Sequence, residues 1–121
     1  MRVDLEAYLA GNKSINASLC YAQESDGILV IRLSPPGMVE RKGHYLSFGM
    51  VLTYSGPVSW SFETIEMGSI EEINAEIDRF GIDSGIKPSI ARGTLKLYKL
   101  GLVQVIGASA HLFDQPIAMM R

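Results

Sequence analysis

The spacing of apolar residues changes along the chain from every second residue to every third or fourth, and the change falls at Ser69. Alternation of apolar and polar residues is typical of half-buried strands, whereas a spacing of three to four is typical of an amphipathic helix. Strands followed by helices favour the α+β class. We therefore expect an α+β fold with an antiparallel sheet of about five strands and two main helices, residues 69–80 and 88–100, packed on one face.

Two apolar runs near the N-terminus predict neighbouring strands. Residues 15–21 alternate, and residues 28–33 are apolar on both faces apart from Arg32, which is typical of a central strand. Parity then predicts the register. Leu19 and Tyr21 share a face with the odd-numbered residues of the second run only if the hairpin loop contains an odd number of residues.

A second pair of strands is predicted over residues 46–54 and 58–64, where even-numbered positions form the apolar face. A three-residue loop, residues 55–57, pairs Leu52 with Trp60 and keeps that face continuous. We expect Trp60, together with the phenylalanine two positions further on, to anchor the core.

The helix over residues 69–80 has the clearest local signal. Ser69-Ile-Glu-Glu72 is a capping box, in which Ser69 accepts from the amide of residue 72 and Glu72 reaches back to the cap. An apolar stripe follows at helical spacing, and Gly81 ends the helix. A shorter helix is expected over residues 4–10, with Gly11 as its end.

Residues 88–100 fit two patterns. Leu95 and Leu97 flank Lys96 as in a strand, but apolar residues at helical spacing extend over a longer stretch. Pro88 near the start and Gly101 just past the end are typical helix boundaries. We predict a helix, followed by a closing strand over residues 102–108.

Length and composition limit the class of protein. The sequence has 121 residues, of which 47% are hydrophobic and 20% charged, so we expect one globular domain over residues 1–121. Cys20 is the only cysteine, which excludes an internal disulfide and suits a reducing compartment. No run approaches the roughly 20 apolar residues of a membrane span. We expect a soluble, cytoplasmic protein with no metal, no cofactor and no membrane partner.

One candidate site is a pocket at the mouth of the predicted sheet. His44 shares parity with the apolar residues that follow it, so it lies at the end of the core-facing row. A histidine in that position can act as a general base or as a ligand-binding group. The predicted pocket residues are His44, Phe48, Tyr54, Trp60 and Phe62.

A second candidate is a basic surface. Residues 67–86 have a net charge of −4 and residues 87–121 a net charge of +4, so an acidic segment precedes a basic one. The cations of the predicted second helix are Arg92, Lys96 and Lys99, and the loop before residue 44 adds Arg41 and Lys42. These cations either contact a partner or pair with the acidic residues of the preceding helix.

The order helix, turn, helix, strand over residues 71–108, with LKLYKLGLVQV as a helix that runs into a wing, resembles winged-helix DNA-binding domains. That resemblance implies a nucleic-acid contact through Arg92, Lys96 and Lys99. The overall charge of −2 lacks the broad basic field of DNA-binding proteins, so we expect no nucleic-acid partner.

The function predicted from the sequence is that of a small non-enzymatic binding module acting on a protein or a small ligand, of an inhibitor, immunity-protein or regulatory kind. A homodimer is compatible with this prediction. Two alternatives stay open: a DNA-binding regulator with a winged-helix-like C-terminal half, and a small enzyme or ligand-binding protein with the His44 pocket.

Overall fold

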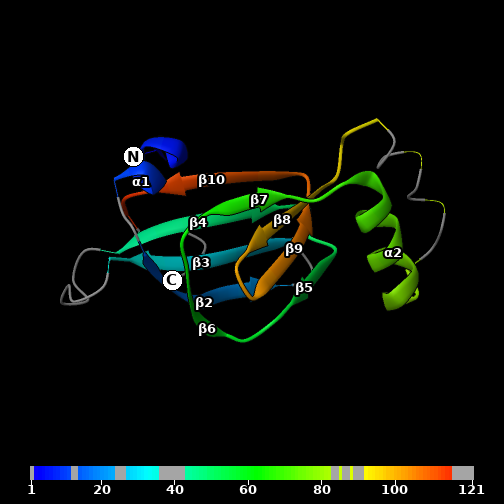
Figure 1. The fold of residues 1–121 in the computed structure, drawn as a ribbon, viewed down its shortest axis with the longest axis horizontal. Coiled ribbons are helices and arrows are strands. Elements are labelled where there is room, and N and C mark those ends of the chain that lie inside the picture. The colour runs from blue at the N-terminus through cyan, green and yellow to red at the C-terminus, as the bar shows by residue number, and fades with distance from the viewer. Residues whose placement is uncertain are drawn as a thin grey trace.

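The computed structural model describes residues 2–11, 14–23, 27–35, 43–82, 85, 88 and 92–115, and it has a mixed α+β fold (Figure 1). Along the chain the elements are β1 Arg2–Val3, α1 Leu5–Ala10, β2 Ile15–Gln23, β3 Ile28–Ser34, β4 His44–Gly49, β5 Thr53–Ser55, β6 Ser59–Phe62, β7 Ile65–Met67, α2 Ile70–Phe80, β8 Lys96–Leu100, β9 Val103–Gly107 and β10 Ser109–Phe113.

The strands form two antiparallel sheets rather than the single sheet of about five strands that the sequence predicts. The order in the six-stranded sheet is β1-β10-β4-β3-β2-β6, and in the four-stranded sheet it is β5-β9-β8-β7. The two helices do not share one face of a sheet. Figure 1 shows α2 beyond one end of the strands and α1 near the other.

Three chain segments contribute a strand to each sheet, namely residues 44–55, 59–67 and 103–113. Through these pairings the strands form a closed ring. Its order is β2, β3, the segment of β4 and β5, the segment of β9 and β10, β8, and the segment of β6 and β7, which pairs again with β2. Because the segment 59–67 returns to lie beside β2, the first four segments along the chain, 15–23, 28–34, 44–55 and 59–67, form a Greek key. The two sheets therefore enclose one interior.

The interior is filled by inward-facing side chains from both sheets. Its buried aromatic members are Phe48, Trp60, Phe62 and Tyr98, and α1 packs against it through Leu5, Tyr8 and Leu9. The prediction that Trp60 and Phe62 anchor the core is confirmed.

The predicted register around Trp60 is wrong. Trp60 lies opposite Ala17 of β2, not opposite Leu52. The predicted strand over residues 46–54 is broken after Gly49, because Met50 adopts a left-handed conformation with φ 51° and the chain crosses to the other sheet. Leu52 is consequently 37% exposed instead of buried.

The hairpin of β2 and β3 corrects the odd-loop prediction. Four residues, 24–27, separate the two strands, which is an even number. A β-bulge between Leu19 and Tyr21 inserts one extra residue into β2 and therefore changes the parity of the pairing. Leu19 lies opposite Ile31 and so shares a face with the odd-numbered residues, as predicted, whereas Tyr21 lies opposite Val30 and has changed face. A bulge depends on cross-strand packing, so the spacing of residues 15–21 does not reveal it.

Helix α2 confirms the capping-box prediction. Ser69 Oγ accepts from the Glu72 amide at 3.2 Å, and a Glu72 carboxylate oxygen accepts from the Ser69 amide at 3.1 Å. Gly81 ends the helix in the left-handed region with φ 69°, a conformation that costs glycine least. The shorter helix α1 is also confirmed, with Asp4 as its N-cap and Gly11 as its end.

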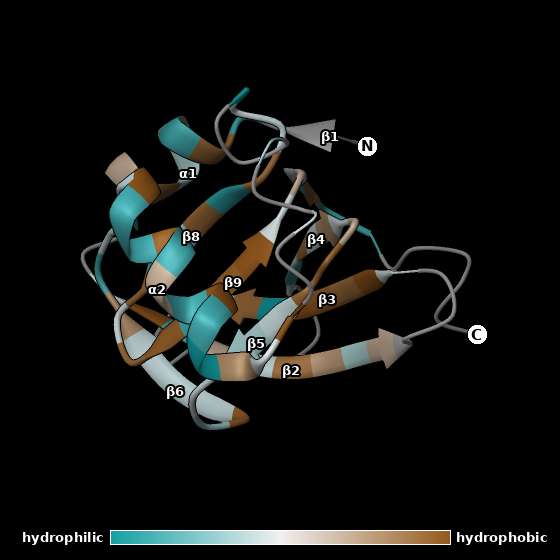
Figure 2. Ribbon diagram, turned by 90° about the vertical axis from the view of Figure 1, so that its right-hand side faces the viewer, coloured by the Kyte–Doolittle hydropathy of each residue, from teal (hydrophilic) through white to brown (hydrophobic). Residues whose placement is uncertain are grey.

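The predicted helix over residues 88–100 is wrong, because residues 96–100 form strand β8. Tyr98 and Leu100 join the interior between the sheets, whereas Leu97 packs outward against α2 in a second cluster with Leu95 and Ile106. A strand that is buried on both sides shows no alternation, and a short apolar run of this kind cannot be told from a helix by spacing alone. Figure 2 shows hydrophobic colour concentrated on β3 and β9, while α2 is mostly hydrophilic.

Candidate functional site

Three of the five predicted pocket residues fill the interior. Phe48 packs edge-on against Tyr98 with ring centroids 5.2 Å apart, and Trp60 stacks on Phe62 at 6.5 Å. The Trp60 indole N–H donates to the Leu100 carbonyl at 2.8 Å. Phe48, Trp60 and Phe62 therefore contribute to packing, and a pocket formed by all five residues stays a prediction.

His44 lies at the start of β4 in the six-stranded sheet, whereas Tyr54 lies in β5 of the four-stranded sheet. Its ring contacts Tyr8 of α1, with centroids 4.5 Å apart and the planes tilted by 44°. His44 Nδ1 is buried and has no hydrogen-bond partner among the residues that the structure describes. The second histidine, His111, lies on β10, opposite Ser47 of β4.

Tyr54 lines an open pocket of about 370 Å³ between β3 and β5. The pocket exists because the chain turns away from β3 at Met50 and crosses to the other sheet. At the base of the pocket, the Val51 amide donates a hydrogen bond to the Gly27 carbonyl at 2.9 Å. Strand β5 is the terminal strand of its sheet, so the pocket lies along a sheet edge. The pocket is lined by Ala22, Gly27, Ile28, Leu29, Val51, Leu52, Thr53 and Tyr54.

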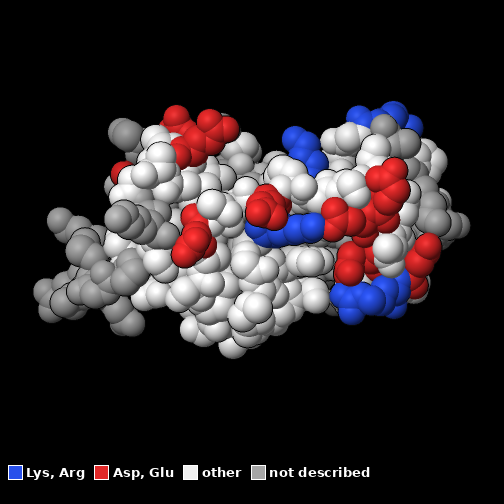
Figure 3. Space-filling view, viewed as in Figure 1, with Lys and Arg blue, Asp and Glu red and all other residues white. Residues whose placement is uncertain are grey.

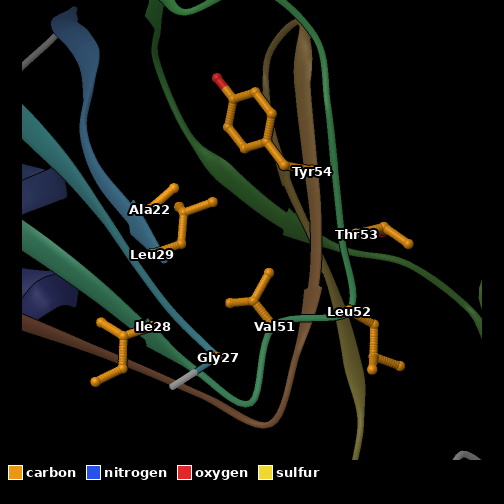
Figure 4. A pocket seen from close by; sticks show the side chains of 8 residues that line it. All are labelled: Ala22, Gly27, Ile28, Leu29, Val51, Leu52, Thr53 and Tyr54. Atoms are coloured by element: carbon orange, nitrogen blue, oxygen red, sulfur yellow. The ribbon is translucent and has the colours of Figure 1, made fainter. Parts of the chain in front are cut away.

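The side chains give this pocket an apolar character. Figure 4 shows Val51 and Tyr54 turned toward Ala22 and Leu29 across the gap, while Thr53 points away from it. The Tyr54 hydroxyl donates to the Pro57 carbonyl, and burial raises the pKa of the Tyr54 phenol above its ordinary value. The pocket offers hydrophobic contact and no charged group of its own.

The chain segment that forms the β5 side of the pocket carries no charge of its own, and a charged group that reaches it is the Arg79 guanidinium, which donates to Ser55 Oγ at 3.4 Å. Residues 43–62 contain no Asp, Glu, Lys or Arg, and Met50 and Val58 are 64% and 63% exposed. Figure 3 shows uncharged surface over β5 and β6, whereas acidic side chains gather on α2. Large exposed apolar surface of this kind marks interaction sites in folded proteins.

The predicted basic surface is divided by the fold. Lys99 forms an ion pair with Glu72, which confirms the internal pairing that the sequence offered as one possibility. Its hydrogen bond, with help from the Ser69 amide, holds the pKa of the Glu72 carboxyl below its ordinary value. Arg92 and Lys96 are exposed and line one groove with apolar residues. Arg41 and Lys42 lie outside the described residues.

Sequence reasoning missed the residues at the base of the pocket, Gly27, Val51 and Leu52, because it placed residues 46–54 in one strand. A glycine or proline is the usual signal of a break, and the residue that turns the chain here is Met50. The resemblance to winged-helix domains required a recognition helix over residues 88–100, and β8 takes its place.

Comparisons with models of known families, with curated proteins and with solved structures found no match. Among the described helices, neither is long and apolar enough to cross a membrane. Within the described part of the chain, no three His, Cys, Asp or Glu side chains gather in a way that could hold a metal ion.

Proposed function

We propose that the protein is a small non-enzymatic binding module whose pocket between β3 and β5 holds an extended, uncharged segment of a protein partner. The observation that carries this proposal is the position of the pocket. An aliphatic hollow lies directly beside β5, the terminal strand of the four-stranded sheet. An extended peptide can add to such an edge through main-chain hydrogen bonds while its side chains enter neighbouring pockets.

The lack of charge supports the same partner. Natural edge strands are usually protected by lysine, by proline or by a bulge, but the stretch from Gly43 to Phe62 has no charged residue. A partner segment without charge loses no ion hydration when it covers Met50 and Val58, which are already exposed.

The size of the pocket fits a side chain rather than a whole ligand. Ligand sites range from about 300 to 1,000 Å³ and bury most of a drug-sized molecule, and this pocket, at about 370 Å³, is near the lower limit and open on one side. One or two aliphatic side chains of a peptide match that space better than an enclosed small molecule.

Selection from a random peptide library on the immobilised protein tests the proposal. We expect enrichment of peptides with aliphatic or aromatic residues at every second position and few charges, because alternate side chains of a strand point the same way. Ala22→Glu places a carboxylate at the mouth of the pocket, at an exposed position, and should weaken the selected peptides at least about tenfold.

Ala75→Glu is the matched control, since Ala75 is exposed on α2 and outside the pocket. Peptides that bind the Ala22→Glu and Ala75→Glu variants equally well, or a selection without a common alternating pattern, would contradict the proposal. Thermal denaturation of both variants shows whether the fold is retained.

A further inference from the structure

A groove of about 400 Å³ lies between α2 and the segment that leads into β8, away from the pocket beside β5. It is formed where the chain passes from β7 into α2 alongside β8. The lining residues are Met67, Gly68, Ile70, Ile73, Arg92, Gly93, Leu95 and Lys96.

The floor of this groove is held in place by close backbone packing. The Gly68 amide donates to the Leu97 carbonyl at 2.9 Å, and a Cβ atom on Gly68 would lie 2.4 Å from Leu97 Cδ2. Ile73 and Leu95 are buried at the bottom and belong to the cluster between α2 and the sheet. The groove is thus a fixed feature of the α2–β8 contact.

The walls of the groove expose apolar surface that the chain itself does not cover. Met67 is 54% exposed and Ile70 48% exposed, although Ile70 lies on the apolar stripe of α2. Both side chains extend the apolar area beyond the hollow. A segment of a protein covers such an area better than a small molecule that fits only the hollow.

The charge at the rim selects the kind of segment. Arg92 and Lys96 are exposed there, and the Lys96 side chain has no hydrogen bond or ion pair with any residue that the structure describes. In contrast to Lys96, the described cations Lys99 and Arg79 form ion pairs within the chain, because Lys99 pairs with Glu72 and Arg79 pairs with Glu76 at 2.6 Å. The rim therefore offers positive charge to an incoming group.

We propose that this groove is a second binding site, for an acidic, apolar segment of a protein partner. An aliphatic side chain of the segment packs on Ile73 and Leu95, and one of its carboxylates pairs with Lys96, while Arg92 adds positive charge at the rim. This site is independent of the pocket beside β5, and each of the two sites can fail without the other.

Titration of three capped hexapeptides into the ¹⁵N-labelled protein tests this site. The probes are Glu-Asp-Leu-Leu-Asp-Glu, its basic counterpart Lys-Lys-Leu-Leu-Lys-Lys, and the apolar-deficient Glu-Asp-Ser-Ser-Asp-Glu. Only the first should shift the amides of Gly68, Gly93, Leu95 and Lys96. The shift should weaken with added salt, because exposed ion pairs are screened.

Lys96→Glu should reduce the affinity for the acidic leucine peptide about tenfold, since it replaces attraction at the rim with repulsion. Arg79→Glu makes the same change of charge at the other end of α2 and should leave the affinity unchanged. Equal binding of the basic peptide, shifts confined to the pocket around Ala22, or no shift at millimolar peptide would each overturn the assignment.

Discussion

The indole of Trp60 connects the two sheets, and its replacement is the most informative test of the fold. Trp60 belongs to the six-stranded sheet, whereas its hydrogen-bond acceptor, the Leu100 carbonyl, belongs to the four-stranded sheet. Trp60→Phe keeps an aromatic ring in the interior but removes the donor. Trp60→Ala removes both the donor and the ring that stacks on Phe62.

The magnitudes follow from these two losses. A buried carbonyl left without its partner costs about 1–3 kcal/mol, and truncation of a buried tryptophan to alanine costs about 3–5 kcal/mol more. One kcal/mol shifts Tm by about 3–6 °C in a domain of this size. Trp60→Phe should therefore lower Tm by about 3–18 °C, and Trp60→Ala, which loses about 4–8 kcal/mol in total, should remove a large part of a typical stability of about 5–15 kcal/mol.

Urea and thermal denaturation, followed by far-ultraviolet circular dichroism, measure both changes. The control is Leu102→Ala, which truncates an apolar side chain that is 74% exposed and should leave Tm almost unchanged. If Trp60→Phe is as stable as Leu102→Ala, the bond between the sheets contributes nothing. If Trp60→Ala melts within about 2 °C of the parent protein, Trp60 does not lie in the core.

Two further predictions concern the first turn of α2. Ser69→Ala should destabilise the protein by about 1 kcal/mol, because the Glu72 amide loses its acceptor. Ser59→Ala, at an exposed position, is the control. An unchanged urea midpoint for Ser69→Ala would show that the cap does not stabilise the helix. The pKa of Glu72 is lowered by its hydrogen bond to Lys99 and then by the Ser69 amide, so its contribution is present above the unfolded pKa of about 4.3 and is lost as pH falls through the lower folded value. Glu72→Gln should flatten the pH dependence of stability in that acidic range, and a carboxyl titration of Glu72 with a midpoint at or above the unfolded value would refute this reasoning.

The candidate sites were only partly accessible from the sequence. Tyr54 and the pair Arg92 and Lys96 line two surface hollows in the structure, but the sequence placed Tyr54 in a pocket with His44 and the two cations on a helix, and their role in binding stays a prediction. Their neighbours in the two hollows were not predicted. Val51 follows the break at Met50, and Met67 is the last residue of β7, just before the chain enters α2. A pocket is a property of several segments, and spacing within one segment does not show which others will lie beside it.

Local chemistry alone determined the capped ends of both helices and the alternating inward positions of β4 and β6. A cap needs only a side chain and backbone atoms within one turn, and alternation needs only one buried face. The identity of β8, the corner at Met50 and the bulge in β2 were decided by tertiary structure. In each case the outcome depends on contacts between residues far apart in the chain. For β8, α2 covers the outer side of Leu97. At the corner, residues 53–55 pair in the second sheet and not with β3, and at the bulge Val30 lies opposite Tyr21. A hydrophobic pattern records that a side chain is buried, but only the assembled sheets determine which neighbour buries it.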